Sequence, residues 1–222
     1  MSALVRSLAG YCRDHPLDEK VFVVPSFVAG RRIGEALARE AGSWVNLRFV
    51  TIPALAAEVL ERRGETGRPG LMTASAEMAL TDRLFRQMLA EGKAAYFEKA
   101  GASPGLSRAL HRAVQDLRLD GRTGADLTPG LFLAPDKGRA LALLLTRYER
   151  ALLEEGRLDL AGFLDRAAAA ARRGPLGALF LCPADTRLRR LEAEFLAAAS
   201  GGRLLTVPGD PVNGLELSLI HI

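Results

Sequence analysis

The sequence predicts an α/β protein, built on an incomplete parallel sheet that is interrupted by an all-helical insertion. Two short runs of β-branched and aromatic residues, Val21–Val24 and Trp44–Val50, are each followed by a segment of helical periodicity. Residues 67–173 then show helical periodicity without a convincing strand, and strand character returns at Ala178–Cys182. Strands that alternate with helices are typical of a parallel sheet.

The first strand and helix form the stretch around which the chain is organised, KVFVVPSFVAGRRIGEALARE from Lys20 to Glu40. The strand is too short for a helix and uninterrupted enough to be buried on both faces. Pro25 and Ser26 end it, and an amphipathic helix follows from about Val28 to Ala41. A short helix over Ala3–Cys12 precedes the stretch.

The later elements are bounded by capping residues and helix breakers. Thr51 is a candidate N-cap, and Pro53 suits the first turn of the helix after the second strand. An α/β domain in two segments, residues 1–66 and 174–216, is expected around a helical insertion at residues 67–173. The remaining predicted elements are helices over Ala74–Glu91, Gly105–Leu119, Pro135–Glu155 and from the cap Asp159 to Arg173, a helix capped by Asp185, and a strand over Leu204–Val207.

Composition and charge exclude several classes of protein. The chain has 222 residues, and its net charge of +4 is too small to indicate nucleic-acid binding by itself. No apolar run approaches the ~20 residues that span a bilayer, and the N-terminus is too polar for a signal peptide. Cys12 and Cys182 have no CxxC partner or nearby histidine at ligand spacing, which favours reduced, buried thiols. We therefore predict a cytoplasmic protein without a membrane partner.

The sequence contains no recognisable catalytic constellation. His15 lies in a predicted turn and His111 in a predicted helix, positions that favour surface histidines over catalytic bases. No Gly-rich segment ending in Gly-Lys-Ser/Thr is present to cradle phosphate, and no serine has a G-x-S-x-G frame. We expect no cofactor in this part of the protein.

Residues suited to anion binding follow the first two strands. Ser26, with the backbone amides after it, and the arginines Arg31 and Arg32 are placed to meet a phosphate group at the exit of the first strand. Thr51 is placed similarly at the exit of the second. In the alternative interpretation, the hydroxyls only cap helices and the arginines are solvated. A second basic run has the same two interpretations: Arg187, Arg189 and Arg190.

The order of these motifs resembles the start of AddB-type subunits, proteins that carry a PD-(D/E)XK nuclease domain. VFVVPS with its basic helix, VNLRFVTIPALAAEVL, KGRALALLLTRYERAL, RLDLAGFLDRA and ALFLCPADTRLRRLEAEFLAA follow one another as in that family. The resemblance covers nearly all of residues 20–211. It implies a P-loop NTPase fold of the UvrD-like, superfamily-1 helicase type, in which Ser26 and Thr51 fall on segments that contact the DNA backbone.

The chain departs from an active helicase at both nucleotide-binding motifs. LAGYCRDHPLDEK stands where the Walker A glycines and lysine belong, and only Asp185 remains of the Walker B acidic pair. The resemblance therefore implies an inactivated, non-catalytic region of a subunit that acts in double-strand break repair or recombination. Sequence-independent contact with DNA backbone and a UvrD-like helicase partner subunit are expected, with any nuclease domain located C-terminally in the parent protein.

Two other classes of function stay open. One is a small-ligand α/β domain that binds a nucleotide or a sugar phosphate at the exits of the first two strands. The other is a protein-interaction scaffold that uses the helical insertion as its contact surface and has no DNA role.

The last six residues are expected to be foreign to the natural protein. Leu217–Ile222, LSLIHI, matches the translation of a common sequencing adapter. The chain is accordingly expected to be the N-terminal fragment of a longer protein, with its genuine sequence ending near Glu216.

Overall fold

The computed structural model describes residues 2–65 and 70–209, so the adapter-like tail at residues 217–222 lies outside the described part of the chain. The described residues divide into two compact units. The sheet unit falls within residues 1–66, 166–188 and 192–222, and the helical unit within residues 67–165 and 189–191. The division at residue 166 lies inside a helix, whereas the boundary expected from the sequence is residue 174.

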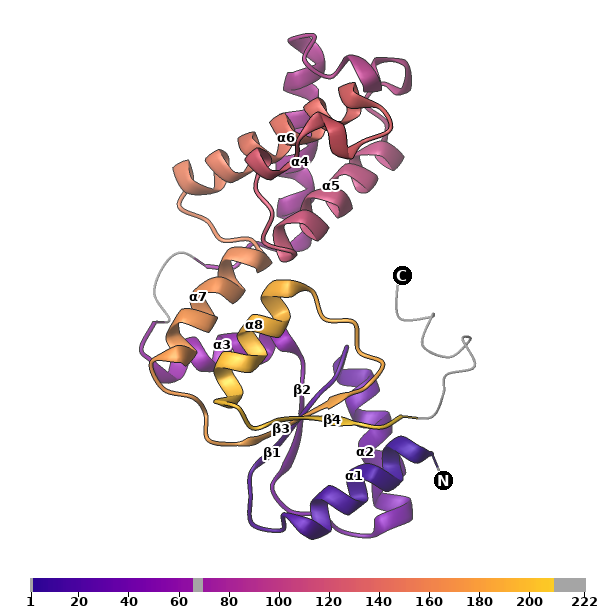
Figure 1. Ribbon diagram of the computed structural model, residues 1–222, viewed down its shortest axis with the longest axis vertical. Helices are drawn as coiled ribbons and strands as arrows, with labels where there is room; N and C mark the ends of the chain where they lie inside the picture. Colours follow the sequence, from indigo (N-terminus) through magenta and orange to yellow (C-terminus); the bar gives the residue numbers. More distant parts are fainter. Residues whose placement is uncertain (1, 66–69, 210–222) are drawn as a thin grey trace. The chain divides into compact units, whose positions relative to one another are not determined.

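The sheet unit has an all-parallel sheet of four strands in the order β2-β1-β3-β4 (Figure 1). Every residue of β1 is buried, because this strand is central in the sheet. The predicted α/β class with a parallel sheet is confirmed. The strands are β1 (Lys20–Val23), β2 (Leu47–Val50), β3 (Leu179–Pro183) and β4 (Leu204–Val207).

Helices cover both faces of this sheet. Figure 1 shows α1 (Ala3–Asp14) and α2 (Phe27–Ala41) on one face, and α3 (Ile52–Arg62) and α8 (Arg190–Ser200) on the other. A buried cluster on the first face joins the two helices to the sheet, because apolar residues of α1 and α2 recur at helical spacing. Its members include Leu8, Leu37, Phe22, Leu181 and Val207.

Two element boundaries differ from the sequence prediction, for local reasons. β2 starts after Asn46 rather than at Trp44, because Asn46 has a φ of 56°, which is incompatible with an extended strand. The last helix begins at Arg190 and is not capped by Asp185, because residues 184–189 form a turn followed by irregular backbone.

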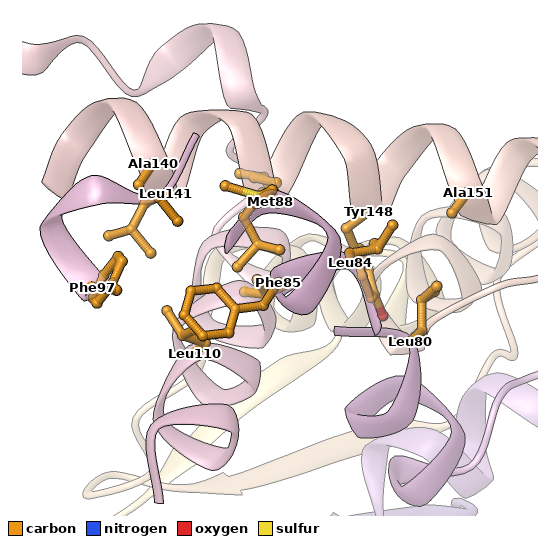
Figure 2. Close-up of a cluster of buried hydrophobic side chains, with 14 of the residues drawn as sticks. Leu80, Leu84, Phe85, Met88, Phe97, Leu110, Ala140, Leu141, Tyr148 and Ala151 are labelled. Carbon is orange, nitrogen blue, oxygen red and sulfur yellow. The ribbon is translucent and has the colours of Figure 1, made fainter. Parts of the chain in front are cut away.

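The helical unit packs around one apolar core, shown in Figure 2, to which α4, α5 and α6 contribute. Ser103 caps α5, since its hydroxyl accepts the Leu106 amide at 3.3 Å. No helix in residues 2–65 and 70–209 is long and apolar enough to cross a membrane. The helices of this unit are α4 (Ala74–Ala90), α5 (Pro104–Leu119), α6 (Pro135–Glu154) and the start of α7 (Leu160–Arg172), with short 3-10 turns η1 (Ala95–Ala100), η2 (Gly124–Asp126) and η3 (Pro129–Leu131).

A polar network ties α5, α6 and α7 together. Arg118 donates to both carboxylate oxygens of Asp159, at 3.0 and 3.3 Å, and to Glu149 at 3.0 Å. Asp159 is 4% exposed, and it also accepts the Gly162 amide at 2.8 Å. The predicted cap of α7 is therefore confirmed, and its carboxylate is buried against a single arginine.

His111 is buried, which corrects the expectation of a surface histidine. It shares one face of α5 with Ser107 and Val114, which are also buried and lie at helical spacing from it. Its Nδ1 has no hydrogen-bond partner in the described part of the chain, and burial lowers the pKa of its imidazole. The neutral ring therefore acts as part of the packing of α5.

Candidate nucleic-acid interface

The candidate interface is the edge of the sheet at which β1 and β2 end. The two strands are parallel with Val23 opposite Val50, and the Val24 amide donates to the Val50 carbonyl at 2.9 Å. Ser26 and Thr51 follow these strand ends, so the structure brings both predicted hydroxyl residues to one edge of the sheet. Ligands of open parallel sheets bind beyond the edge where the strands end.

The strand order creates a topological switch point beside Ser26. β1 connects outward to β2, whereas its other neighbour β3 connects to β4 on the opposite side. Crevices of doubly wound sheets open where the connections diverge in this way. Exposed Asp185 follows β3 at the same edge. Within residues 2–65 and 70–209, no three His, Cys, Asp or Glu side chains are arranged to hold a metal ion.

Ser26 is the N-cap of α2. Its backbone is extended, its hydroxyl oxygen accepts the Ala29 amide at 3.1 Å, and its carbonyl accepts the Gly30 amide at 3.0 Å. Ser26 therefore caps α2. A hydroxyl has one donor besides its acceptor lone pairs, so the capping bond leaves the Ser26 proton free to donate to an anion.

Thr51 occupies the N-cap position of α3 without a capping bond from its side chain. An N-cap oxygen accepts from the second or third helical amide, and here the second helical residue is Pro53, which has no N–H. The backbone cap is retained, since the Thr51 carbonyl accepts the Leu55 amide at 2.9 Å. The half-buried hydroxyl is therefore not used for capping.

The two predicted arginines lie in the second turn of α2 and are exposed to solvent. Arg31 pairs with Glu35 one turn further on, at 2.8 Å between Nε and Oε1, and hydrogen bonding to Arg31 lowers the pKa of Glu35. Such exposed pairs contribute little stability, so the guanidinium can exchange its partner for a phosphate. Long helical side chains lean towards the N-terminus of their helix, which is the end at which Ser26 lies.

Two exposed apolar residues beside Ser26 were assigned no role by sequence reasoning. Phe27 is 66% exposed and Val28 is 64% exposed, in the first turn of α2. Their exposure could have been predicted from the sequence, because both residues precede the apolar stripe of the helix and are not part of it. This turn lies close to β2, since a Cβ added at Gly30 would lie only 2.8 Å from the Phe49 Cβ.

The second basic run does not form a comparable patch. Within the helical unit, Arg189 pairs with Asp116 at 2.6 Å, and the Arg190 Nε donates to the Asp120 carbonyl at 2.8 Å. These arginines therefore bind the end of α5. Of the three arginines of this run, only Arg187 is exposed and makes no such contact with the described residues.

Comparison with models of known protein families found no match, and comparison with the sequences of curated proteins found none either.

Proposed function

We propose that this chain is the non-catalytic, helicase-like N-terminal region of a cytoplasmic helicase/nuclease subunit that acts on DNA in double-strand break repair or recombination. In this proposal the edge formed by Ser26, Thr51, Arg31 and Arg32 contacts the DNA backbone. The observation that carries it is that Ser26 and Thr51 follow the ends of neighbouring parallel strands at one edge of the sheet, while Arg31 and Arg32 are exposed on the helix that begins there.

The chemistry of this edge suits a phosphodiester. The free proton of Ser26 and the unused hydroxyl of Thr51 are neutral donors, and the arginines supply positive charge. Hydroxyl and guanidinium contacts with phosphate position a strand without reading its bases. Binding of this kind is independent of sequence and sensitive to salt, because each neutralised phosphate releases counterions.

The absence of nucleotide-binding motifs from the sequence supports a non-catalytic role. Phosphoryl transfer from ATP needs a phosphate cradle with a lysine, a magnesium ligand and a residue that orients water. The sequence has no Gly-Lys-Ser/Thr segment, and Asp185 alone stands where an acidic pair is needed. Strand separation in the parent complex is therefore assigned to a UvrD-like partner subunit.

The test measures binding of fluorescent oligonucleotides of unrelated sequences, single-stranded and duplex, by anisotropy across a salt series. Arg31→Ala/Arg32→Ala should reduce the salt slope by up to about 1.8 for duplex or 1.4 for single strands, two phosphate contacts in each case. The matched control is Arg150→Ala, because Arg150 is also exposed and pairs one turn on, with Glu154. An unchanged slope in the double variant contradicts the proposal.

Thr51→Val separates DNA contact from stability. Thr51 makes no side-chain capping bond, so the thermal midpoint should be retained while affinity falls about fivefold, the equivalent of one hydrogen bond of ~1 kcal/mol. Ser26→Ala would lower both quantities, because it also removes a cap. Binding of nucleotides or sugar phosphates in place of DNA, lost in the same variants, would favour the small-ligand alternative.

A further inference from the structure

A second surface lies at the opposite edge of the sheet, where β1 and β2 begin. Residues 15–19, between α1 and β1, meet residues 42–46, between α2 and β2 (Figure 1). The Lys20 amide donates to the Asn46 carbonyl at 2.6 Å, and the Asn46 side-chain amide donates to the Leu17 carbonyl at 3.1 Å. The two loops are therefore joined directly by hydrogen bonds.

A buried lysine fixes the first of these loops. Lys20 is fully buried, and its ammonium group donates to the carbonyls of His15 at 2.5 Å and Asp18 at 2.7 Å. Burial of an ammonium group is costly unless hydrogen bonds replace its water. The backbone turn of the second loop is made at Asn46, the only non-glycine residue in the described ranges with a positive φ. Both loops are thus held in one conformation by specific polar contacts.

These ordered loops present apolar side chains to solvent. Leu17 is 88% exposed and Val45 is 64% exposed. Beside them is a hollow of 190 Å³, lined by Cys12, Pro16 and Trp44 among others. A cavity of roughly 150 Å³ accepts a benzene molecule, so this hollow has room for a leucine side chain.

The surface therefore carries a protruding leucine and an apolar hollow next to each other. Pro16 lines the hollow and Leu17 follows it in the chain. Arg13, also in the lining, and its neighbour Asp14 carry opposite charges, and neither has an ion-pair partner in the described part of the chain. An isologous interface has to offer both halves of each contact on one surface, and a knob beside a hollow and both charges meet that requirement.

We propose that this surface is a homodimer interface, in which Leu17 of each copy enters the hollow of the other. A closed two-fold pairing explains why several hydrogen bonds fix a loop whose tip is apolar and exposed, because preorganisation lowers the entropic cost of association. It leaves the Ser26 edge free, so the inference does not depend on the proposed DNA contact.

The first test is sedimentation velocity of the 222-residue chain over about 1–100 μM, a range that brackets micromolar dissociation constants. Wild type should shift reversibly from monomer to dimer. Leu17→Lys should weaken the dimer about 100-fold, because two leucines are lost per dimer and each burial is worth about tenfold or more. The control is Leu133→Lys, which alters a fully exposed leucine of the helical unit and should leave association unchanged.

The second test locates the interface without a substitution. Cys12 lines the hollow, whereas Cys182 is buried in the sheet unit. Alkylation of Cys12 by iodoacetamide, followed by mass spectrometry, should be slower for wild type at high protein concentration than at low, and independent of concentration in Leu17→Lys.

Several results would overturn the inference. A monomer at every concentration removes it, as does a dimer in which Cys12 reacts at the monomer rate. Equal loss of association in Leu17→Lys and Leu133→Lys would indicate non-specific apolar contact. Because Leu17 is almost fully exposed, its replacement should leave the circular dichroism spectrum unchanged, and the comparison is between folded proteins.

Discussion

Replacing Arg118 with alanine removes the one guanidinium that faces the buried carboxylate of Asp159. In the wild type Arg118 donates to both oxygens of Asp159 and to Glu149. After the substitution, Asp159 keeps the Gly162 amide as a donor, but its charge is left without a cation at 4% exposure. We expect the helical unit to lose stability, because a buried charge without a partner is strongly unfavourable.

The expected loss follows from the exposure of the two partners. Removal of one partner of a buried ion pair costs about 3–5 kcal/mol. The side chain of Arg118 is 21% exposed and that of Asp159 is 5% exposed, so some water reaches the site and the lower end, about 3 kcal/mol, is expected. The control Arg150→Ala breaks an exposed pair with Glu154 and should cost about 0.5 kcal/mol or less.

Urea unfolding followed by far-ultraviolet circular dichroism measures the difference. With an m-value of about 2 kcal/mol/M, a loss of 3 kcal/mol lowers the midpoint by about 1.5 M. Asp159→Asn in the Arg118→Ala background should recover part of the loss, because asparagine retains an N-cap oxygen and removes the stranded charge. Hydrogen exchange at the Gly162 amide should accelerate in Arg118→Ala.

One result would refute this reasoning. If Arg118→Ala costs no more than Arg150→Ala, and Asp159→Asn recovers nothing, the carboxylate is adequately solvated without the arginine. The network would then be a set of surface contacts rather than a determinant of how α7 begins.

Three further substitutions test burial and close packing. Burial raises the pKa of Glu77, which is 3% exposed and accepts a hydrogen bond from Gln115. The folded protein therefore binds the carboxyl proton of Glu77 more tightly than the unfolded chain does. As a result, the free energy of unfolding falls as the pH rises from the ordinary glutamate pKa to the raised value. Glu77→Gln should flatten that fall, measured as the change in Tm between about pH 4 and pH 7, and an unchanged pH dependence counts against it. Gly30→Ala places a Cβ 2.8 Å from the Phe49 Cβ and should cost about 1–3 kcal/mol of stability. The control Gly10→Ala has open space around its Cβ and should stabilise α1 by about 0.5–1 kcal/mol. Equal effects of the two variants in urea unfolding would contradict the close approach of α2 to Phe49.

The strands and most helix starts could be predicted from sequence because local rules determine them. Ser26 and Ser103 cap helices as their residue type indicates. Thr51 does not use its hydroxyl in this way, since the proline two residues later removes one of the amides that it would accept. The tertiary partners of a residue are not local, and this is why the buried positions of Lys20 and His111 were not foreseen.

The candidate site was predictable only in part, for the same reason. Ser26 and Thr51 could be placed at one edge because parallel strands end on the same side of a sheet. Arg189 and Arg190 could not be separated from a basic surface patch by composition, because their partners are Asp116 and the Asp120 carbonyl, some 70 residues earlier in the chain. Whether a run of arginines is available for binding can be judged only when the fold shows which of them already have partners within the chain.

The pairing of β1 with β3 at the centre of the sheet has a consequence for biosynthesis. Lys20 pairs with Leu179, so the side of β1 that will bind β3 has no partner strand while roughly 150 residues are translated. At 5–20 residues per second, this takes about 8–30 s. β1 and β2 emerge early with one apolar edge open, and residues 67–165 of the helical unit are translated before that edge can close. The interval is a window in which the nascent chain is open to strand pairing with other chains, so slower translation between the two segments should increase its dependence on chaperones.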